Sequence, residues 1–582
     1  MRRLLKYLKK HPVVTVLAPL FKMLEASFEL FVPLVVARMV DVGIGQQRSG
    51  SLWQMGGILI LLGIVGFGFS VTAQYFAAKS AVSAGMAMRN DLFAHINTLS
   101  YKEIDTVGTS TLINRMTNDI NQVQNGINMF LRLFLRSPFV VFGAMIMAFT
   151  VDVRAALPFA AAIPLLLVVV FAILLVSMPL YRRVQKQIDK VLLSTRENLL
   201  GIRVVRAFNH QDSEMEHFRQ ESTVLFERQI HVGKISALLN PLTYVIINLG
   251  IIAILWSGGR QVYIGSLTQG QVIALINYMS QILAELIKLA NLIILLSKSM
   301  ASLNRVNQIF DMRPSIDEEG LPLKRRGKEG TPAVQFKNVS FRYTDTGKET
   351  LSRLSFTAMP GQTTGIIGGT GSGKTSLVSL IPRFYDASEG EVLINGQDVK
   401  TLAPASIRSH IGLVPQKAQL FKGTLRENIR WGKPDATDED IYQALGTAQA
   451  NEFVDSRREG LELMIEQDGG NLSGGQKQRL TIARALVRRP GILILDDSAS
   501  ALDFATDAKL RKAIRQDTEQ MTVFLVSQRV SAIKNADQII VLDDGHIEGI
   551  GTHDVLLASC PVYKEIYESQ ISGQEVAHHA DA

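Results

Sequence analysis

The sequence predicts two parts: an all-α membrane domain of six helices with long helical extensions, followed by an α/β domain. Three observations predict this division. Residues 1–300 contain several long apolar runs, although charged residues make up 20% of the whole chain. Residues 315–582 read as an ordinary soluble domain, in which short β-rich runs alternate with helical patterns. In that second part, a glycine-rich segment lies between an apolar strand and an amphipathic helix.

Composition shifts set the expected boundaries. We expect a membrane domain over 1–310, a linker over 311–333, the α/β domain over 334–570 and a disordered tail over 571–582. The linker contains the charged stretch DEEGLPLKRRGKEGTP.

Six stretches in the membrane part are long and apolar enough to cross a bilayer, which takes about 20 residues. They are 13–40, 53–78, 128–151, 155–180, 237–259 and 267–297. The basic start MRRLLKYLKK resembles the beginning of a signal peptide. The apolar run after it is too long, however, and no small-residue cleavage site follows, so we expect a retained first helix.

The positions of Lys and Arg orient these helices. The N-terminus and the connections 86–127 and 181–235 carry 18 of them, whereas the three short loops opposite carry one each. The positive-inside rule therefore places the N-terminus and both long connections in the cytosol. The connections are polar but helix-friendly, so we expect long cytosolic helical extensions that reach roughly 30–35 Å and have tips at 105–112 and 201–212. Plain long loops are the alternative.

Some of the membrane helices carry charged residues. Lys22, Glu25 and Glu29 share one face of the first helix. The sixth helix carries a similar stripe, consisting of Asn277, Gln281, Glu285 and Lys288. One interpretation is a substrate pathway that includes the first three residues together with Asn277 and Gln281. The other is a set of internal pairs, Lys22 with Glu25 and Glu285 with Lys288, and the sequence leaves both open.

Charge and cysteine content exclude two simpler interpretations. The net charge of +8 does not indicate a nucleic-acid partner, because many basic residues lie in loops beside membrane helices. The single cysteine, Cys560, excludes an internal disulfide and fits a reducing cytosol for the α/β domain.

The glycine-rich segment Gly368–Thr375 fits the phosphate-loop pattern G-x-x-x-x-G-K-[ST]. Its glycines allow backbone N–H groups to close around phosphate at a helix N-terminus. Lys374 would offset the charge of the β- and γ-phosphates, and the Thr375 hydroxyl would ligate Mg²⁺. The sequence therefore predicts an α/β P-loop nucleotide-binding domain that uses ATP and Mg²⁺. The ATP-binding residues expected in and beside the loop are Gly368, Gly369, Thr370, Gly371, Ser372, Gly373, Lys374, Thr375 and Ser376.

Two further motifs support this prediction. Asp496 ends the buried run GILILD, where a carboxylate can hold Mg²⁺ through water. Upstream, NLSGGQKQR (471–479) has the small residues of a phosphate-facing backbone nest at a helix start, with Ser473 as a donor.

Taken together, these motifs resemble those of the ATP-binding cassette (ABC) exporters over nearly the whole chain. The resemblance also rests on LVPQ, which contains Gln416, on LSGGQ at 472–476 and on SALD at 500–503. It implies that Tyr343 stacks on adenine, that Gln416 touches Mg²⁺ and the attacking water, and that Asp503 communicates across a dimer. The residues implied to contact ATP held by the other subunit are Ser473, Gly474, Gly475 and Gln476. The partner implied is a second ABC half-transporter, and the two cytosolic tips are similar to coupling helices.

Two positions depart from the hydrolytic pattern of this family. The family's general base, Glu, is replaced by Asp497, and its switch histidine is replaced by Gln528. A base must lie within hydrogen-bond reach of the water it activates, and Asp is one methylene shorter. Conservative drift with retained activity is the alternative to a site that binds without turning over. The sequence is similar to the degenerate-site half of heterodimeric bacterial multidrug exporters.

The expected function is ATP-dependent efflux of drug-like or amphipathic substrates by one half of a dimer. We expect a multi-pass protein of a bacterial plasma membrane, in contact with lipid, with its nucleotide-binding domain in the cytosol. The alternatives are a homodimeric lipid flippase and an ATP-gated membrane subunit that does not pump.

Overall fold

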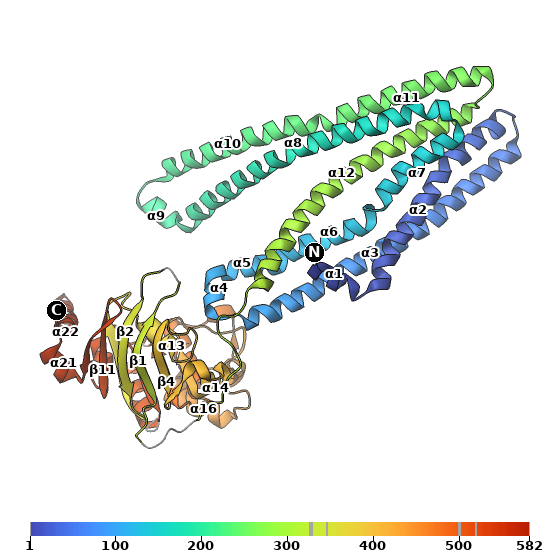
Figure 1. The fold of residues 1–582 in the computed structure, drawn as a ribbon. Coiled ribbons are helices and arrows are strands. Elements are labelled where there is room, and N and C mark those ends of the chain that lie inside the picture. Colours follow the sequence, from blue (N-terminus) through green and yellow to red (C-terminus); the bar gives the residue numbers. More distant parts are fainter. Residues whose placement is uncertain (1, 325–329, 345–346, 499–501, 518–520, 581–582) are drawn as a thin grey trace. The chain divides into compact units, whose positions relative to one another are not determined.

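The computed structural model describes residues 2–324, 330–344, 347–498, 502–517 and 521–580. Two compact units result, one comprising Met1–Asn97 and Thr109–Met312, and the other Thr98–Gly108 and Arg313–Ala582 (Figure 1). The first unit is helical and the second is α/β, as the sequence predicts.

The helical unit is built from a few long helices with short breaks. In chain order its α-helices are α1 (Arg2–Lys9), α2 (Pro12–Arg38), α3 (Ser49–Thr98), α5 (Thr109–Asn114), α6 (Ile120–Leu133), α7 (Arg136–Val151), α8 (Val153–Leu200), α9 (Ile202–Ala207), α10 (Gln211–Ala237), α11 (Leu239–Ile264) and α12 (Gln269–Asp311). Short π-helical turns at Met39–Ile44 and Arg115–Asp119 adjoin α2 and α6. Helix α12 packs against α2, α6, α7 and α11.

The helices extend well beyond a bilayer. Helices α3 and α8 contain 50 and 48 residues, which at about 1.5 Å per residue is more than twice the roughly 30 Å of hydrocarbon to be crossed. Helix α8 runs beside α10 and α11, with the short helix α9 between them at the predicted tip (Figure 1). The prediction of long helical extensions is confirmed, and the plain-loop alternative is wrong for the described residues.

Among the described residues, five helical segments are long and apolar enough to span a membrane. They correspond to the second to sixth predicted stretches. Helix α2 corresponds to the first stretch and contains 27 residues, but Lys22, Glu25 and Glu29 lower its hydropathy. The third span is interrupted between α6 and α7, although Phe134 and Leu135 keep right-handed helical dihedrals.

The described residues of the α/β unit form three sheets. Its strands are β1 (Val334–Phe341), β2 (Leu351–Ala358), β3 (Thr363–Gly368), β4 (Glu389–Ile394), β5 (Gln397–Asp398), β6 (Ile411–Val414), β7 (Gly423–Thr424), β8 (Met464–Ile465), β9 (Ile492–Asp496), β10 (Thr522–Val526), β11 (Gln538–Asp543) and β12 (His546–Gly551). The six-stranded sheet has the order β12-β11-β3-β10-β9-β6 and is parallel except for β12. It confirms the predicted mostly parallel sheet. The antiparallel sheet β2-β1-β4-β5 is an addition that the sequence did not predict.

Helices surround these sheets. They are α13 (Lys374–Leu380), α14 (Pro404–His410), α15 (Leu425–Arg430), α16 (Asp438–Thr447), α17 (Asn451–Asp455), α18 (Gly474–Leu486), α19 (Phe504–Asp517), α20 (Val530–Ile533), α21 (His553–Ser559) and α22 (Pro561–Ala580). The backbone of α22 continues into the predicted tail 571–582, of which residues 581–582 lie outside the described residues. The disorder of that tail stays a prediction, as do the domain boundaries.

Helix α4 and the first part of the predicted tip 105–112 belong to the α/β unit. Helix α4 (Tyr101–Val107) begins with a capping box made by Ser100, whose hydroxyl also accepts a hydrogen bond from the backbone of Ile316. The Tyr101 ring stacks on Phe384 with centroids 4.5 Å apart, and the Tyr385 hydroxyl donates to Asp105 at 2.5 Å. Burial, helped by the Asp105 carboxylate, raises the pKa of Tyr385, so this hydroxyl remains a donor at neutral pH. These contacts fix α4 on the α/β unit.

Replacing Tyr101 with Ala should loosen α4, because an aromatic pair of this kind contributes about 0.5–1.5 kcal/mol. Hydrogen–deuterium exchange of the amides in 101–107 should become about two- to tenfold faster. A matched control is Thr106→Ala, since the exposed Thr106 hydroxyl donates only to the Lys102 carbonyl of the same helix. Equal exchange in the two variants would show that the ring contact does not hold α4.

Candidate functional site

The phosphate loop connects the end of β3 to the start of α13. Gly371 and Gly373 have φ values of +87° and +98°, in the left-handed region that favours glycine. A Cβ on Gly368 would lie 2.1 Å from the Leu542 carbonyl oxygen. Gly369, Thr370 and Gly371 are exposed, so the loop presents its backbone to solvent at the position predicted for phosphate.

Lys374 is folded back onto this loop. Its Nζ donates to the carbonyls of Gly368 at 2.9 Å and Gly369 at 2.6 Å. Burial lowers the pKa of Lys374, and the nearby Asp496 and Asp497 oppose that shift. The ammonium therefore lies beside both the loop and the acidic pair.

The acidic pair, Asp496 and Asp497, lies at the same sheet edge as the phosphate loop, because β3, β10 and β9 are parallel neighbours. In the register of this sheet, Val526 faces Ile366 on one side and Asp496 on the other. The Thr375 hydroxyl donates to Asp496 Oδ1 at 3.2 Å. Burial raises the pKa of Asp496, and the neighbouring Asp497 adds to this shift. The predicted Mg²⁺ residues Thr375 and Asp496 are thus in direct contact.

Asp497 stands directly after β9 with a positive φ of 46°. Its backbone N–H donates to the Val526 carbonyl at 3.1 Å, which holds this residue against β10. Burial raises the pKa of Asp497, while Lys374, Arg529 and a hydrogen bond with Gln416 lower it. The structure therefore brings the predicted residues Gln416, Asp496 and Asp497 together.

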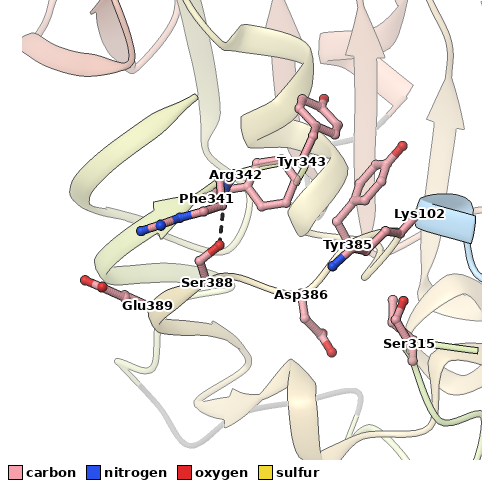
Figure 2. A pocket seen from close by; sticks show the side chains of 10 residues that line it. Lys102, Ser315, Phe341, Arg342, Tyr343, Tyr385, Asp386, Ser388 and Glu389 are labelled. Carbon is pink, nitrogen blue, oxygen red and sulfur yellow. Dashed lines mark hydrogen bonds between the residues drawn. The ribbon is translucent and has the colours of Figure 1, made fainter. Parts of the chain in front are cut away.

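Tyr343 lies beside a cavity of 370 Å³ in the α/β unit (Figure 2). Its hydroxyl and the Ser376 hydroxyl are 2.9 Å apart, and 41% of the side chain is exposed. Its ring contacts the edge of Tyr385, with centroids 5.2 Å apart. Tyr385, which also bonds to Asp105 of α4, was missed by the sequence analysis. The aromatic pair in RFYD was the available signal.

The LSGGQ segment forms the start of α18. The Ser473 hydroxyl accepts from the backbone N–H of Gln476 at 3.3 Å, and the Gln476 side chain accepts from the Ser473 N–H at 2.9 Å. This capping box holds Ser473 and Gly474 exposed at the helix N-terminus. LSGGQ therefore begins a helix, as predicted, and its contact with phosphate stays a prediction.

Gln528 and Asp503 lie at the surface of the unit. Gln528 follows β10 with an exposed side chain, and its carbonyl accepts from the Gln570 side chain at 2.7 Å. Asp503 accepts from the Thr506 N–H at 3.0 Å, and this hydrogen bond lowers the pKa of Asp503. Ser500 and Ala501 of the SALD motif lie outside the described residues.

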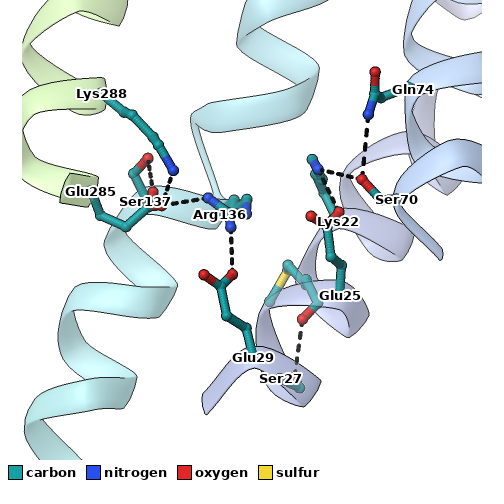
Figure 3. Close-up of polar contacts among 11 residues, drawn as sticks. Lys22, Glu25, Ser27, Glu29, Ser70, Gln74, Arg136, Ser137, Glu285 and Lys288 are labelled. Atoms are coloured by element: carbon teal, nitrogen blue, oxygen red, sulfur yellow. Dashed lines mark hydrogen bonds and ion pairs between the residues drawn. The ribbon is translucent and has the colours of Figure 1, made fainter. Parts of the chain in front are cut away.

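In the helical unit, both predicted ion pairs are formed (Figure 3). Lys22 contacts Glu25 and also donates to Ser70 of α3 at 3.3 Å. Lys288 donates to Glu285 at 2.7 Å.

The sequence analysis missed the residue that connects these charges. Arg136, inside the predicted span 128–151, donates to Glu285 at 2.5 Å and to Glu29 at 2.5 Å. Ser137 also donates to Glu285, at 2.8 Å. Lys22 was identified as a charged residue inside a predicted span. The same criterion would also have identified Arg136.

The two uncharged residues of the predicted pathway take no part in these ion pairs. Asn277 and Gln281 of α12 are half-buried, and the buried Gln281 Oε1 has no hydrogen-bond partner among the described residues.

Comparison with known proteins supports a single family. Residues 15–286 match the family described as ABC transporter transmembrane region, and residues 351–500 match the one described as ABC transporter. The chain is 36% identical over 570 residues to the uncharacterized ABC transporter ATP-binding protein YfiB of Bacillus subtilis, with 98% of each chain covered. It is 33% identical over 479 residues to a protein of Mycobacterium bovis named fatty acid ABC transporter ATP-binding/permease protein, covering 82% of this chain and 75% of that one.

The fold agrees with this assignment. A solved structure of a bacterial Atm1-family ABC exporter with ATP bound superposes with a TM-score of 0.79 at 23% identity, covering 96% of this chain and 98% of that one. The chain therefore belongs to the ABC transporter family, as a half-transporter with the exporter fold that uses ATP to drive transport across a membrane.

Proposed function

We propose that this chain is one half of a heterodimeric exporter and that its own nucleotide site holds ATP with little hydrolysis. The observation that carries this proposal is the pair Asp497 and Gln528, at the two positions where the family's hydrolytic pattern has Glu and His. Both replacements affect the hydrolysis of the bound nucleotide, whereas the residues that bind the nucleotide are intact. In the family the working unit is a dimer, so the exposed LSGGQ segment of this chain is available to complete the partner's hydrolytic site.

The local geometry explains why Asp497 is a poor general base. Its backbone is anchored to Val526, so its carboxylate cannot advance by the length of the missing methylene without breaking that contact. Gln528 can still donate a hydrogen bond, but it never carries the charge of an imidazolium. The loss of contacts made in the transition state costs roughly 10²–10³-fold in rate.

The residues that hold ATP and Mg²⁺ follow from the same geometry. Tyr343 would stack on adenine, the exposed loop around Gly369 would surround the phosphates, and Lys374 would turn from its carbonyl contacts toward phosphate oxygens. The oxygen donors of Thr375, Asp496 and Gln416 fit Mg²⁺, which prefers hard oxygen ligands and keeps several waters. When bound, the ion offsets phosphate charge. Asp503 would transmit the state of this site to the partner.

Transport would follow from closure of the two ATP-binding domains. Closure around two ATP molecules moves the helical extensions, and the contacts of α4 with Phe384 and Tyr385 supply a route to the helical unit. Hydrolysis at the partner's site then resets the pair. The N-terminus and the ATP-binding domain would face the cytosol of a bacterium, as the 18 Lys and Arg on that side indicate.

The proposed substrates are drug-like or amphipathic molecules. The Mycobacterium bovis relative named as a fatty acid transporter supports an amphiphile. Lys22, Glu25, Glu29, Asn277 and Gln281 remain a proposed pathway. Because the acids are paired with Lys22 and Arg136, the charged members contribute to helix packing as well.

The variant Asp497→Glu combined with Gln528→His should raise the ATPase rate of the purified chain alone by about 10²-fold, because it restores the base and the charged contact. Phosphate release from detergent-solubilised protein is the measurement. Adding Asp496→Asn to the double variant is the control, and this should remove the gain. Brisk hydrolysis by the unmodified chain alone would refute the holding-site proposal.

Asp496→Asn should stabilise the nucleotide-free chain at neutral pH by about 2–4 °C in Tm, the shift that ~1 kcal/mol produces in a domain of this size. A carboxyl whose folded pKa is raised stabilises the fold below its unfolded pKa, and this contribution is lost as pH rises through the folded pKa. The neutral amide avoids that loss, so the advantage of the variant should shrink as pH falls.

Thermal unfolding with and without Mg-ATP separates the two roles of Asp496. The unmodified chain should gain stability from Mg-ATP, and Asp496→Asn should gain much less. A variant less stable than the unmodified chain without nucleotide, or one equally stabilised by Mg-ATP, would contradict the assignment.

A further inference from the structure

Arg132 is a surplus cation in the membrane part of the helical unit. The charges around it balance one another: Arg136, Lys22 and Lys288 are paired with Glu29, Glu25 and Glu285 (Figure 3). Arg132 lies on α6, one turn before Arg136, and is near enough to Lys22 to repel it. It makes no ion pair or hydrogen bond within the part of the chain that the structure describes, so one positive charge lacks a counter-ion.

The surroundings of Arg132 are polar but neutral. Its Nε is fully buried, and so is a nearby side-chain oxygen without a partner among the described residues, Asn128 Oδ1. Asn128 is one turn before Arg132 on the same face of α6. Carboxamides can turn to present either their oxygen or their NH₂ group, but they cannot neutralise a guanidinium.

The depth of Arg132 suggests what neutralises it. In the proposed orientation it lies four residues inside the cytosolic end of the span 128–151, or about 6 Å into the hydrocarbon. A charged side chain at such a depth is costly without an anion, and the Nε of Arg132 is buried within the protein. An anion that enters from the cytosolic leaflet would meet Arg132 before it meets the balanced pairs.

Apolar rings border the same region on the side of α2 and α3. Phe21 stacks on Phe69 and Phe76, and Phe69 also stacks on Phe28, with centroids 5.5–6.1 Å apart. Phe21 adjoins Lys22 in sequence, and Phe69 adjoins Ser70, the partner of Lys22. These half-buried rings offer a surface for an acyl chain next to the charges.

We propose that Arg132, with Asn128, binds the anionic headgroup of an acyl-chain amphiphile drawn from the cytosolic leaflet. This inference rests on the proposed export of amphipathic substrates and narrows it to anionic ones. Carboxylate and phosphate headgroups share the required chemistry, since both accept charge-assisted hydrogen bonds from a guanidinium.

Binding to the full chain in nanodiscs of zwitterionic phosphatidylcholine tests the proposal. Three probes are titrated: oleate, dioleoyl phosphatidic acid and the uncharged oleyl alcohol. At least one anionic probe should bind about tenfold or more tightly than the alcohol, and the two anionic probes distinguish carboxylate from phosphate. Arg132→Gln should remove this preference and Arg132→Lys should keep most of it. The control Arg154→Gln, at an exposed residue, should leave it unchanged.

Two results would overturn the proposal: equal affinity for oleyl alcohol and both anionic probes, or an unchanged preference in Arg132→Gln. Export assays with the partner subunit separate this failure from failure of the proposed function. Export of amphiphiles regardless of headgroup charge and of Arg132 would refute the anion site alone. Binding of the anionic probes through Arg132 without export of any amphiphile would refute the proposed function and leave the site in place.

Discussion

The parallel pairing of β10 between β3 and β9 is the constraint on which the nucleotide site depends. Parallel strands bring their carboxyl ends to one edge of the sheet, so the loop after β3 lies close to the two acids at the end of β9. This pairing places Thr375 in hydrogen-bond contact with Asp496 and brings Lys374 close to both acids. It also fixes Asp497 through Val526. The same backbone contact that builds the site therefore limits what a shortened side chain can reach.

The helical unit obeys a different constraint, because charges at membrane depth must be neutralised. Arg136 provides this by connecting Glu29 of α2 with Glu285 of α12 at the start of α7. Three helices far apart in sequence are thus held by one side chain. Among the described residues Arg132 has no acidic partner, which is why we propose it as the binding site of an anionic headgroup.

Much of this arrangement could be predicted from the sequence. The phosphate loop, Asp496 and LSGGQ are short motifs whose chemistry requires particular residues at fixed spacing, so their local structures follow directly. Hydropathy and length predicted the long helices for the same reason. The pairs Lys22–Glu25 and Glu285–Lys288 were predictable because i,i+3 neighbours share a helix face.

Contacts between distant segments could not be predicted in this way. The contacts of Arg136 with Glu29 and Glu285, and of Tyr385 with Asp105, join elements separated by more than 100 residues, and no local pattern encodes such pairings. The antiparallel sheet was missed although β2 alternates between buried and exposed residues, whereas the parallel strands β9 and β10 are buried throughout.

In the proposed mechanism, the nucleotide site of this chain holds ATP while the site of its partner hydrolyses it. Photolabelling with radiolabelled azido-ATP tests it most directly: the pair is loaded, chased with unlabelled Mg-ATP through many turnovers, and then irradiated. Label should remain as intact triphosphate on this chain and be lost from the partner. Equal loss of label from both chains within one turnover would contradict it.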